Sequence, residues 1–198
     1  MASESDSVED HMIDLTPACD QMVDLLGRIA VDQLALPTPC SEYTVRDLID
    51  HVDGVAVGST ATARGAELPA AGPGARSGPD AGVEGDWLKR VGKHVWAVGE
   101  AWLNPAAWRG GTVAAGVDLS NELWGKITLT ELVVHGWDLA KATGLPFELA
   151  EPTLRACYEH VVEFVPNAPV SGLWAPPIQV PDDAPLIDRL VAVTGRTP

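Results

Sequence analysis

Apolar residues recur every three or four positions in several separate stretches of the chain, and this spacing is typical of helices that bury one face. The first stretch begins at Leu15 and includes Ile29, and we expect its helix to continue until close to Pro37. A second helix is expected to begin after Thr44, because Asp47 three residues later completes the pattern of a capping box. Both helices are predicted to turn an apolar side toward a common core.

Two more amphipathic helices are predicted further along the chain. The stretch from Trp87 to Trp102 has apolar residues on one face, and Pro105 is expected to end this helix. Ser120 is a suitable N-cap for the next helix, which we expect to end just before Gly144. Most of the tryptophans are expected to pack in the core, namely Trp87, Trp96, Trp102 and Trp124.

The remaining segments differ from the four helices in composition. A glycine- and proline-rich stretch over 65–85 favours a mobile loop, which would suit a lid. After residue 145 the pattern predicts a helix from Glu151, an extended proline-broken segment and a short final helix capped near Asp183. We therefore predict an all-α four-helix bundle over residues 1–145, with one small strand pairing and a C-terminal extension over residues 146–198 packed on the bundle.

The charge and composition exclude several classes of partner. The chain has 13 basic and 28 acidic residues, and its formal charge of -15 repels phosphate backbones and anionic lipids. Neither an apolar span of bilayer length nor a secretory signal is recognised, so we expect a cytoplasmic protein with no nucleic-acid or membrane partner. Three widely spaced cysteines, Cys19, Cys40 and Cys157, are expected to be reduced thiols.

Candidate chemistry is concentrated in the stretch ELVVHGWDLAKATG. Glu131, His135 and Asp138 are spaced by four and three residues, which places them on one stripe of a helix otherwise rich in apolar residues. A buried carboxylate must neutralise, pair or bind a cation. His51 on the second helix is the best partner elsewhere, and His51, Glu131 and His135 together would form a two-histidine, one-carboxylate metal site with open coordination positions.

Simpler interpretations of the same residues remain open. A Glu and a His four residues apart often mark a solvated helix face, and a lone histidine is more often structural than a ligand. Asp138 either orients His135 or is a surface acid that pairs with Lys141. Cys40 lies before a capped helix and more readily packs than acts as a nucleophile. The remaining histidines are expected to be structural or solvent-facing, namely His11, His94 and His160.

Three blocks in this order, PTPCSEYTVRDLIDHV, ELVVHGWDLAKATG and VPDDAPLIDRLVAVTGRTP, give the chain a family resemblance. The chain resembles actinobacterial metal-binding proteins of the DinB-like superfamily, related to the metal-binding domain of mycothiol-dependent maleylpyruvate isomerase. The resemblance implies a DinB-like four-helix bundle that holds a divalent metal through a histidine and a later Glu-x-x-x-His pair. In this chain those positions are His51, Glu131 and His135, and Asp138 matches the HGWDLA pattern as a residue that supports a ligand.

The resemblance also implies a cofactor and a reaction class. Zinc is the metal implied first, with another divalent ion such as Ni²⁺ or Fe²⁺ as an alternative. A small thiol such as mycothiol would attack an electrophilic substrate in a transfer or isomerisation. Only about 50 residues follow Gly144, too few for the larger second domain of the isomerase, so we do not expect maleylpyruvate isomerisation itself. A non-catalytic metal or thiol-conjugate binding module, a purely structural bundle and a homodimer remain open alternatives.

Overall fold

A computed structural model describes residues 12–67, 84–114, 116–169 and 174–198 of the chain, which is mostly helical. The predicted all-α, DinB-like four-helix bundle is confirmed. Its helices are α2 (Thr16–Leu26), α3 (Val45–Arg64), α4 (Glu84–Trp102) and α5 (Asn121–Thr143). The other elements are η1 (Val31–Gln33), η2 (Pro105–Trp108), β1 (Gly111–Ala114), β2 (Val117–Ser120), α6 (Glu151–Phe164), η3 (Val165–Asn167) and α7 (Leu186–Val193).

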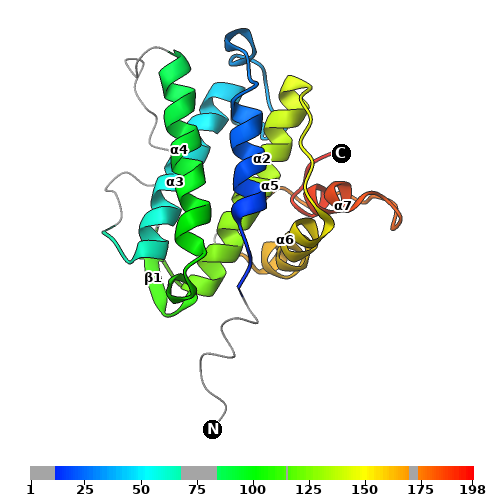
Figure 1. Cartoon of the computed structure of the whole chain (residues 1–198). Coiled ribbons are helices and arrows are strands. Elements are labelled where there is room, and N and C mark those ends of the chain that lie inside the picture. The colour runs from blue at the N-terminus through cyan, green and yellow to red at the C-terminus, as the bar shows by residue number, and fades with distance from the viewer. Residues whose placement is uncertain (1–11, 68–83, 115, 170–173) are drawn as a thin grey trace.

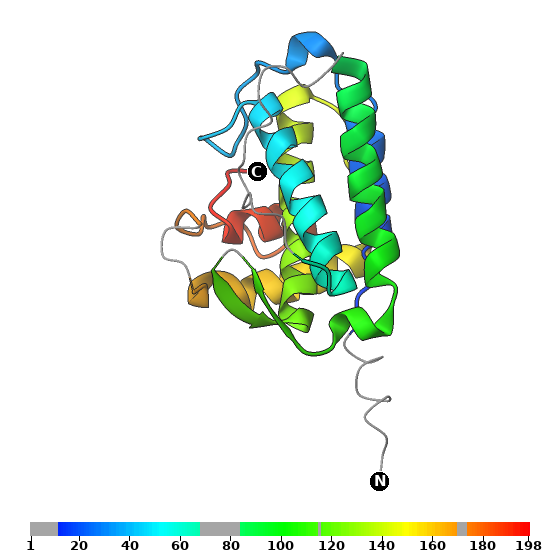
Figure 2. The same cartoon turned by 90° about the vertical axis from the view of Figure 1, so that its left-hand side faces the viewer.

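The four bundle helices form a closed ring of neighbours. Helices α2 and α5 run in one direction and α3 and α4 in the other (Figure 1). Helix α2 packs against α4 and α5, and α3 packs against the same two helices. Helix α6 packs against α5, and α7 packs against α6, so both lie on one side of the bundle (Figures 1 and 2). The predicted lid over 65–85 falls mostly on residues 68–83, outside the described residues.

The core lies between the four helices, and a single small sheet lies at one end of the bundle in the described residues. Strands β1 and β2 form an antiparallel hairpin in which Gly111 pairs with Ser120. This pairing confirms the predicted strand pair. Within the part of the chain that the structure covers, none of the helices combines the length and the apolar content needed to cross a bilayer. The largest fully buried side chains include Leu15, Met22, Leu25, Leu26, Leu48, Ile49, Trp87, Trp102, Leu129 and Leu139.

Hydrogen bonds at the helix ends confirm the predicted caps of α3 and α5. The hydroxyl of Thr44 accepts from the amide of Asp47, whose carboxylate accepts from the Thr44 amide at 3.1 Å. Ser120 accepts from the amide of Leu123 at the start of α5. Gly144 ends α5 with a left-handed φ of 68°, a conformation that glycine adopts without steric cost. These caps fix the limits of the two helices that carry the candidate site.

The first predicted helix is wrong in length. We expected it to continue until near Pro37, but α2 ends at Leu26 and Gly27 follows. The chain then turns into η1, where the Gln33 side chain accepts from the Ala30 amide and donates to the carbonyl of Thr143 at the end of α5. The helix therefore ends before Gly27, although the apolar spacing continues past this residue, and the segment that follows is held by the contact of Gln33 with α5.

Two smaller predictions are also wrong. The last helix is not capped near Asp183, since α7 begins at Leu186 after Pro185, which supplies no side-chain cap. Trp96 does not pack in the core, because 52% of it is exposed. Its neighbour Val95 takes the buried face of α4 instead. The division of the chain at residue 145 stays a prediction.

Helix α5 is buried around most of its circumference, rather than on one face as an amphipathic helix would be. From Leu129 to Ala140 every residue except Glu131 is buried, because α6 covers the side that faces away from the bundle. The helix also approaches aromatic side chains closely at a glycine. A Cβ at Gly125 would lie 2.7 Å from the Trp108 ring and 2.9 Å from the Trp102 ring. Each of these indoles donates a buried hydrogen bond, so neither moves away easily.

We predict that Gly125→Ala destabilises the protein by about 1–3 kcal/mol, the usual cost of overpacking a rigid core. Gly58→Ala is the matched control, since a Cβ at Gly58 on α3 meets nothing within 4 Å. Alanine is the better helix former, so this control should be neutral or more stable by up to about 1 kcal/mol. Urea unfolding of both variants measures the difference, and equal stabilities would contradict the packing argument.

Candidate metal centre

The stripe predicted on α5 forms a hydrogen-bonded row of side chains. The imidazole of His135 lies between two carboxylates, with Nε2 at 3.1 Å from Oε2 of Glu131 and Nδ1 at 3.0 Å from Oδ2 of Asp138. The spacings of four and three residues bring these groups together because side chains at those intervals lie above one another on a helix. The row therefore holds the ring of His135 at both nitrogens.

Helix α3 supplies the third predicted residue. Nε2 of His51 lies 3.0 Å from the same Oε2 atom of Glu131 that faces His135. The two imidazole rings meet edge to face, with centroids 4.9 Å apart. One ligand atom from each of His51, Glu131 and His135 lies within 4.8 Å of the others. The structure thus brings the three predicted residues together, while their role as metal ligands stays a prediction.

The electrostatics of the cluster favour a charged network. Burial raises the pKa of Glu131, but hydrogen bonds from His135 and His51 outweigh burial and hold this pKa well below its usual range. Burial lowers the pKa of His135, yet hydrogen bonds with Asp138 and Glu131 prevail and raise it to about 9. Without a metal, Glu131 is therefore a carboxylate and His135 an imidazolium at neutral pH.

Asp138 is fully buried, so it is not the surface acid that we considered as an alternative. Its carboxylate accepts from Nδ1 of His135, and Arg196 donates to Oδ1 from Nε at 3.1 Å and to Oδ2 from Nη2 at 2.9 Å. Lys141 does not pair with it, since its ammonium lies 5.4 Å from the centre of the Trp137 ring. Burial raises the pKa of Asp138, but the bonds from His135 and Arg196 lower it overall.

Sequence reasoning assigned no role to Arg196. The residue is 58 positions from Asp138 and lies in a tail without periodic pattern, so spacing gave no signal. A chemical signal was available instead: Asp138 lies on a helix rich in apolar residues, and a carboxylate buried there needs a partner such as an arginine. This requirement makes the arginines of the C-terminal segment candidates for a contact with α5.

The surroundings of the two histidines differ. The Nδ1 atom of His51 is buried and has no hydrogen-bond partner among the described residues, whereas Nδ1 of His135 is held by Asp138. Ring contacts orient His51 instead, with the Tyr43 ring centroid at 5.6 Å and His135 on another side. Both Nε2 atoms face one carboxylate oxygen, and this donor set of two imidazoles and one carboxylate suits a divalent metal.

Cys40 lies closer to the site than its predicted packing role implied. Ligand atoms of Cys40, His135 and Asp138 also lie within 4.8 Å of one another. Burial raises the pKa of the Cys40 thiol, although Arg196 lowers it in part, so the neutral thiol is favoured. Because Arg196 already occupies both oxygens of Asp138, this second group suits a cation less well than the first.

The other histidines do not join the candidate site. His94 forms a 2.7 Å contact with Asp53, and His160 is buried and stacks on Phe164. Burial and the nearby Lys126 lower the pKa of His160 to about 4. Both positions agree with the structural roles predicted for them. His11 lies outside the described residues.

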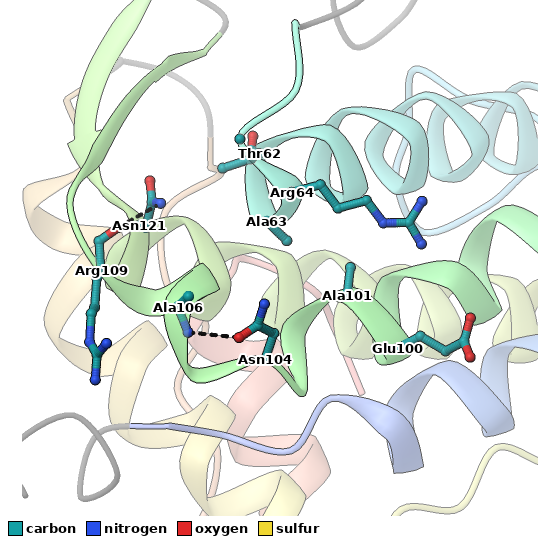
Figure 3. A pocket seen from close by; sticks show the side chains of 10 residues that line it. Thr62, Ala63, Arg64, Glu100, Ala101, Asn104, Ala106, Arg109 and Asn121 are labelled. Atoms are coloured by element: carbon teal, nitrogen blue, oxygen red, sulfur yellow. Dashed lines mark hydrogen bonds between the residues drawn. The ribbon is translucent and has the colours of Figure 1, made fainter. Parts of the chain in front are cut away.

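A cavity of about 650 Å³ lies at another part of the bundle, where α3 and α4 end and η2 begins (Figure 3). Arg64, Glu100 and Arg109 lie on its margin, and their side chains point in different directions rather than toward a common centre. None of the residues that line this cavity belongs to the His51, Glu131 and His135 cluster. The cavity and the candidate metal centre are therefore separate features.

Comparison with known proteins identifies the family. A family model described as the mycothiol maleylpyruvate isomerase N-terminal domain matches residues 15–140. The chain belongs to this family. The match contains α2 to α5 almost entirely, with both helices of the candidate site, and confirms the resemblance inferred from the three sequence blocks. Arg196 lies beyond it, in a tail that the family model does not match.

The chain is also similar to two proteins of Mycobacterium tuberculosis. Two uncharacterized proteins, from strain CDC 1551 / Oshkosh and strain ATCC 25618 / H37Rv, are each 32% identical over 186 residues. The similarity covers 91% of this chain and 94% of each relative, so it extends beyond the bundle. No solved structure gives a significant match.

We predict that two histidines of the metal-free protein have pKa values shifted in opposite directions from the ordinary value of about 6.5. His135 should titrate near pH 9 and His160 near pH 4, as measured by imidazole ¹H–¹⁵N chemical shifts. Because the pKa of His135 is raised by folding, its contribution to stability is fully present below about pH 6.5 and is lost as the pH rises through about 9. Asp138→Asn should lower the pKa of His135, and a value near 6.5 in the unaltered protein would contradict the charged network.

Proposed function

We propose that this protein binds one divalent metal ion through His51, Glu131 and His135, with zinc as the first candidate and Ni²⁺ or Fe²⁺ as alternatives. The observation that carries the proposal is the approach of two imidazole Nε2 atoms, from separate helices, to one carboxylate oxygen at 3.0 and 3.1 Å. Two helices that direct ligands into a bundle interior are a common construction for metal centres. Membership of the family supports the same assignment.

The three residues differ in how they would serve the metal. Glu131 is held as a carboxylate, and His135 is oriented from behind by Asp138, the arrangement in which a second carboxylate fixes a histidine ligand. The side chains of His51 and Glu131 keep 16% and 18% of their surface exposed. Three protein ligands leave at least one coordination position, and this exposure gives a small molecule access to it.

The charge of the cluster supports a thiol as the molecule that binds there. In the metal-free state the two carboxylates are balanced by His135 as imidazolium and by Arg196. Binding a divalent ion requires His135 to lose its proton, so the cluster gains one net positive charge. An anionic thiolate neutralises this charge, and a bound cation favours the thiolate form, which is the nucleophile.

We infer that the activity is a transfer or isomerisation in which a small thiol of the mycothiol type reacts with an electrophilic substrate. The description of the family supports this thiol. The chain's own residues would keep the site in place: Asp138 fixes His135, and Glu131 links the two helices. The metal would supply a Lewis acid that stabilises the thiolate.

We predict that purified protein binds one divalent ion per chain and that His51→Ala, Glu131→Ala and His135→Ala each lose stoichiometric binding. Elemental analysis after removal of free metal measures the ratio. His94→Ala is the matched control, because this histidine pairs with Asp53 away from the cluster. Metal at 100 times its dissociation constant should stabilise the wild type by about 2.7 kcal/mol. Retention of metal by all three variants would show that the assignment is wrong.

We predict that a thiol binds directly to the metal-loaded site. Cobalt-substituted protein should gain a sulfur-to-cobalt charge-transfer absorption when mycothiol is added, because the thiolate takes an open coordination position. Incubation with mycothiol and a panel of electrophiles should consume an electrophile faster than the His135→Ala variant does. Absorption without turnover would instead support a binding module that carries or senses a thiol. If both the absorption and the turnover are absent, thiol binding is excluded.

A further inference from the structure

The C-terminal turn after α7 places Arg196 against α5 through three successive residues. Thr194 donates from its hydroxyl to the carbonyl of Val191. Gly195 follows with a φ of 82°, and the amide of Arg196 donates to the same Val191 carbonyl at 3.1 Å. A Cβ at Gly195 would lie 2.5 Å from the Cβ of Ala175, so both the conformation and the space favour glycine. The turn fixes the direction in which Arg196 leaves the helix.

Each of the three guanidinium nitrogens of Arg196 donates a hydrogen bond. Its Nε and Nη2 atoms donate to the carboxylate of Asp138, and its Nη1 donates to the carbonyl of Thr194 at 3.1 Å. The Trp174 ring lies beside it, with the ring centre 5.6 Å from Cζ. Arg196 is 9% exposed and Asp138 is fully buried, so water does not compete strongly for these hydrogen bonds. A fork of two parallel donors fixes the plane of a carboxylate as well as its position.

We propose that Arg196 is a positioning residue for the metal centre, acting through Asp138 on His135. The inference rests on the proposed metal site. Oδ2 of Asp138 accepts from Arg196 Nη2 at 2.9 Å and faces Nδ1 of His135 at 3.0 Å, so one oxygen joins the tail to the ligand ring. The guanidinium stays outside the group of ligand atoms and holds the carboxylate that orients His135. Groups that orient a metal ligand in this way typically change metal affinity by 10–100-fold.

The same contact makes the binding of the metal and the docking of the C-terminal tail interdependent. If the docked tail strengthens metal binding by holding His135, the bound metal must stabilise the docked tail by the same factor, because coupling between two equilibria is reciprocal. Docking of residues 194–196 is therefore a measurable property of the metal-loaded protein, separate from any catalytic activity.

Arg189 on α7 supplies a matched control seven residues before Arg196. It donates to the hydroxyl of Tyr158 at 3.1 Å and lies over that ring, and no contact joins it to the candidate site in the described residues. Arg196→Gln and Arg189→Gln remove the same charge from the same region. A difference between them therefore reports the contact with Asp138 rather than the loss of an arginine.

The test is a double-mutant cycle on zinc affinity, measured by competition with a chelator of known affinity. Arg196→Gln and Asp138→Asn should each weaken zinc binding by about 10–100-fold. Adding Arg196→Gln to Asp138→Asn should change the affinity by less than about threefold, because the arginine acts through the acid. Arg196→Lys keeps the positive charge but lacks the two parallel donors, so its zinc affinity should lie between those of Arg196→Gln and the wild type. Arg189→Gln should bind zinc as tightly as the wild type does. The visible spectrum of the cobalt form should change in Arg196→Gln and not in Arg189→Gln.

The outcomes separate this inference from the proposed function. Stoichiometric zinc in the wild type together with unchanged affinity in Arg196→Gln would overturn the positioning role and leave the metal site intact. Independent, additive effects of the two substitutions would also overturn it. Wild type that binds none of zinc, Ni²⁺ and Fe²⁺ would overturn both proposals. If Arg196→Gln does not fold, amide hydrogen exchange of the wild type is the deciding measurement. Zinc should slow exchange at the Gly195 and Arg196 amides more than at the amides of the β1–β2 hairpin. Equal slowing at both places would overturn the inference.

Discussion

The buried carboxylate of Asp138 imposes a constraint that reaches across the whole molecule. A charge with no exposed surface is costly unless it is paired and hydrogen-bonded, and breaking a buried pair typically costs about 3–5 kcal/mol. Asp138 meets this requirement with His135 on its own helix and with Arg196 from the end of the chain. The end of the chain therefore balances the charge of Asp138 on α5, in addition to the packing of α7 against α6.

The two candidate histidine ligands depend on different parts of the fold. His135 is held at both ring nitrogens by carboxylates of α5, so its orientation follows from a single helix and the groups bound to it. His51 contacts α5 through the carboxylate of Glu131 and the ring of His135, and the ring of Tyr43 lies on another side. The distance between α3 and α5 therefore determines whether the second imidazole meets the same oxygen. Packing between these helices, including the buried Ser59 and Thr128 hydrogen bond at 2.8 Å, helps to set that distance.

The sequence predicted features whose causes lie close together in the chain. The caps at Thr44, Ser120 and Gly144 are local hydrogen-bonding patterns, and each was recognised from a few adjacent residues. The row on α5 followed from helical spacing alone. Its meeting with His51 was inferred because both helices carry apolar faces that must be buried in one core, and the structure brings these groups together.

Predictions failed where a long-range contact decided the outcome. After α2 ends, the side chain of Gln33 binds the last turn of α5, and this contact cannot be recognised from the apolar spacing. The pairing of Arg196 with Asp138 joins residues 58 positions apart, and no periodicity connects them. Trp96 was assigned to the core because the tryptophans were grouped together at helical core spacing, although its position on α4 directs it to solvent.

Two glycines on α5, Gly125 and Gly136, face aromatic rings on the same side of the helix, three turns apart. Trp108 lies against one, and Phe147 fills the space beside the other, where any Cβ would overlap the ring. An axial shift of one turn, about 5.4 Å, would drive larger side chains into both rings. Helix α5 is thereby locked in its longitudinal register. Sliding the central helix by one turn would therefore require both aromatic side chains to move out of its way.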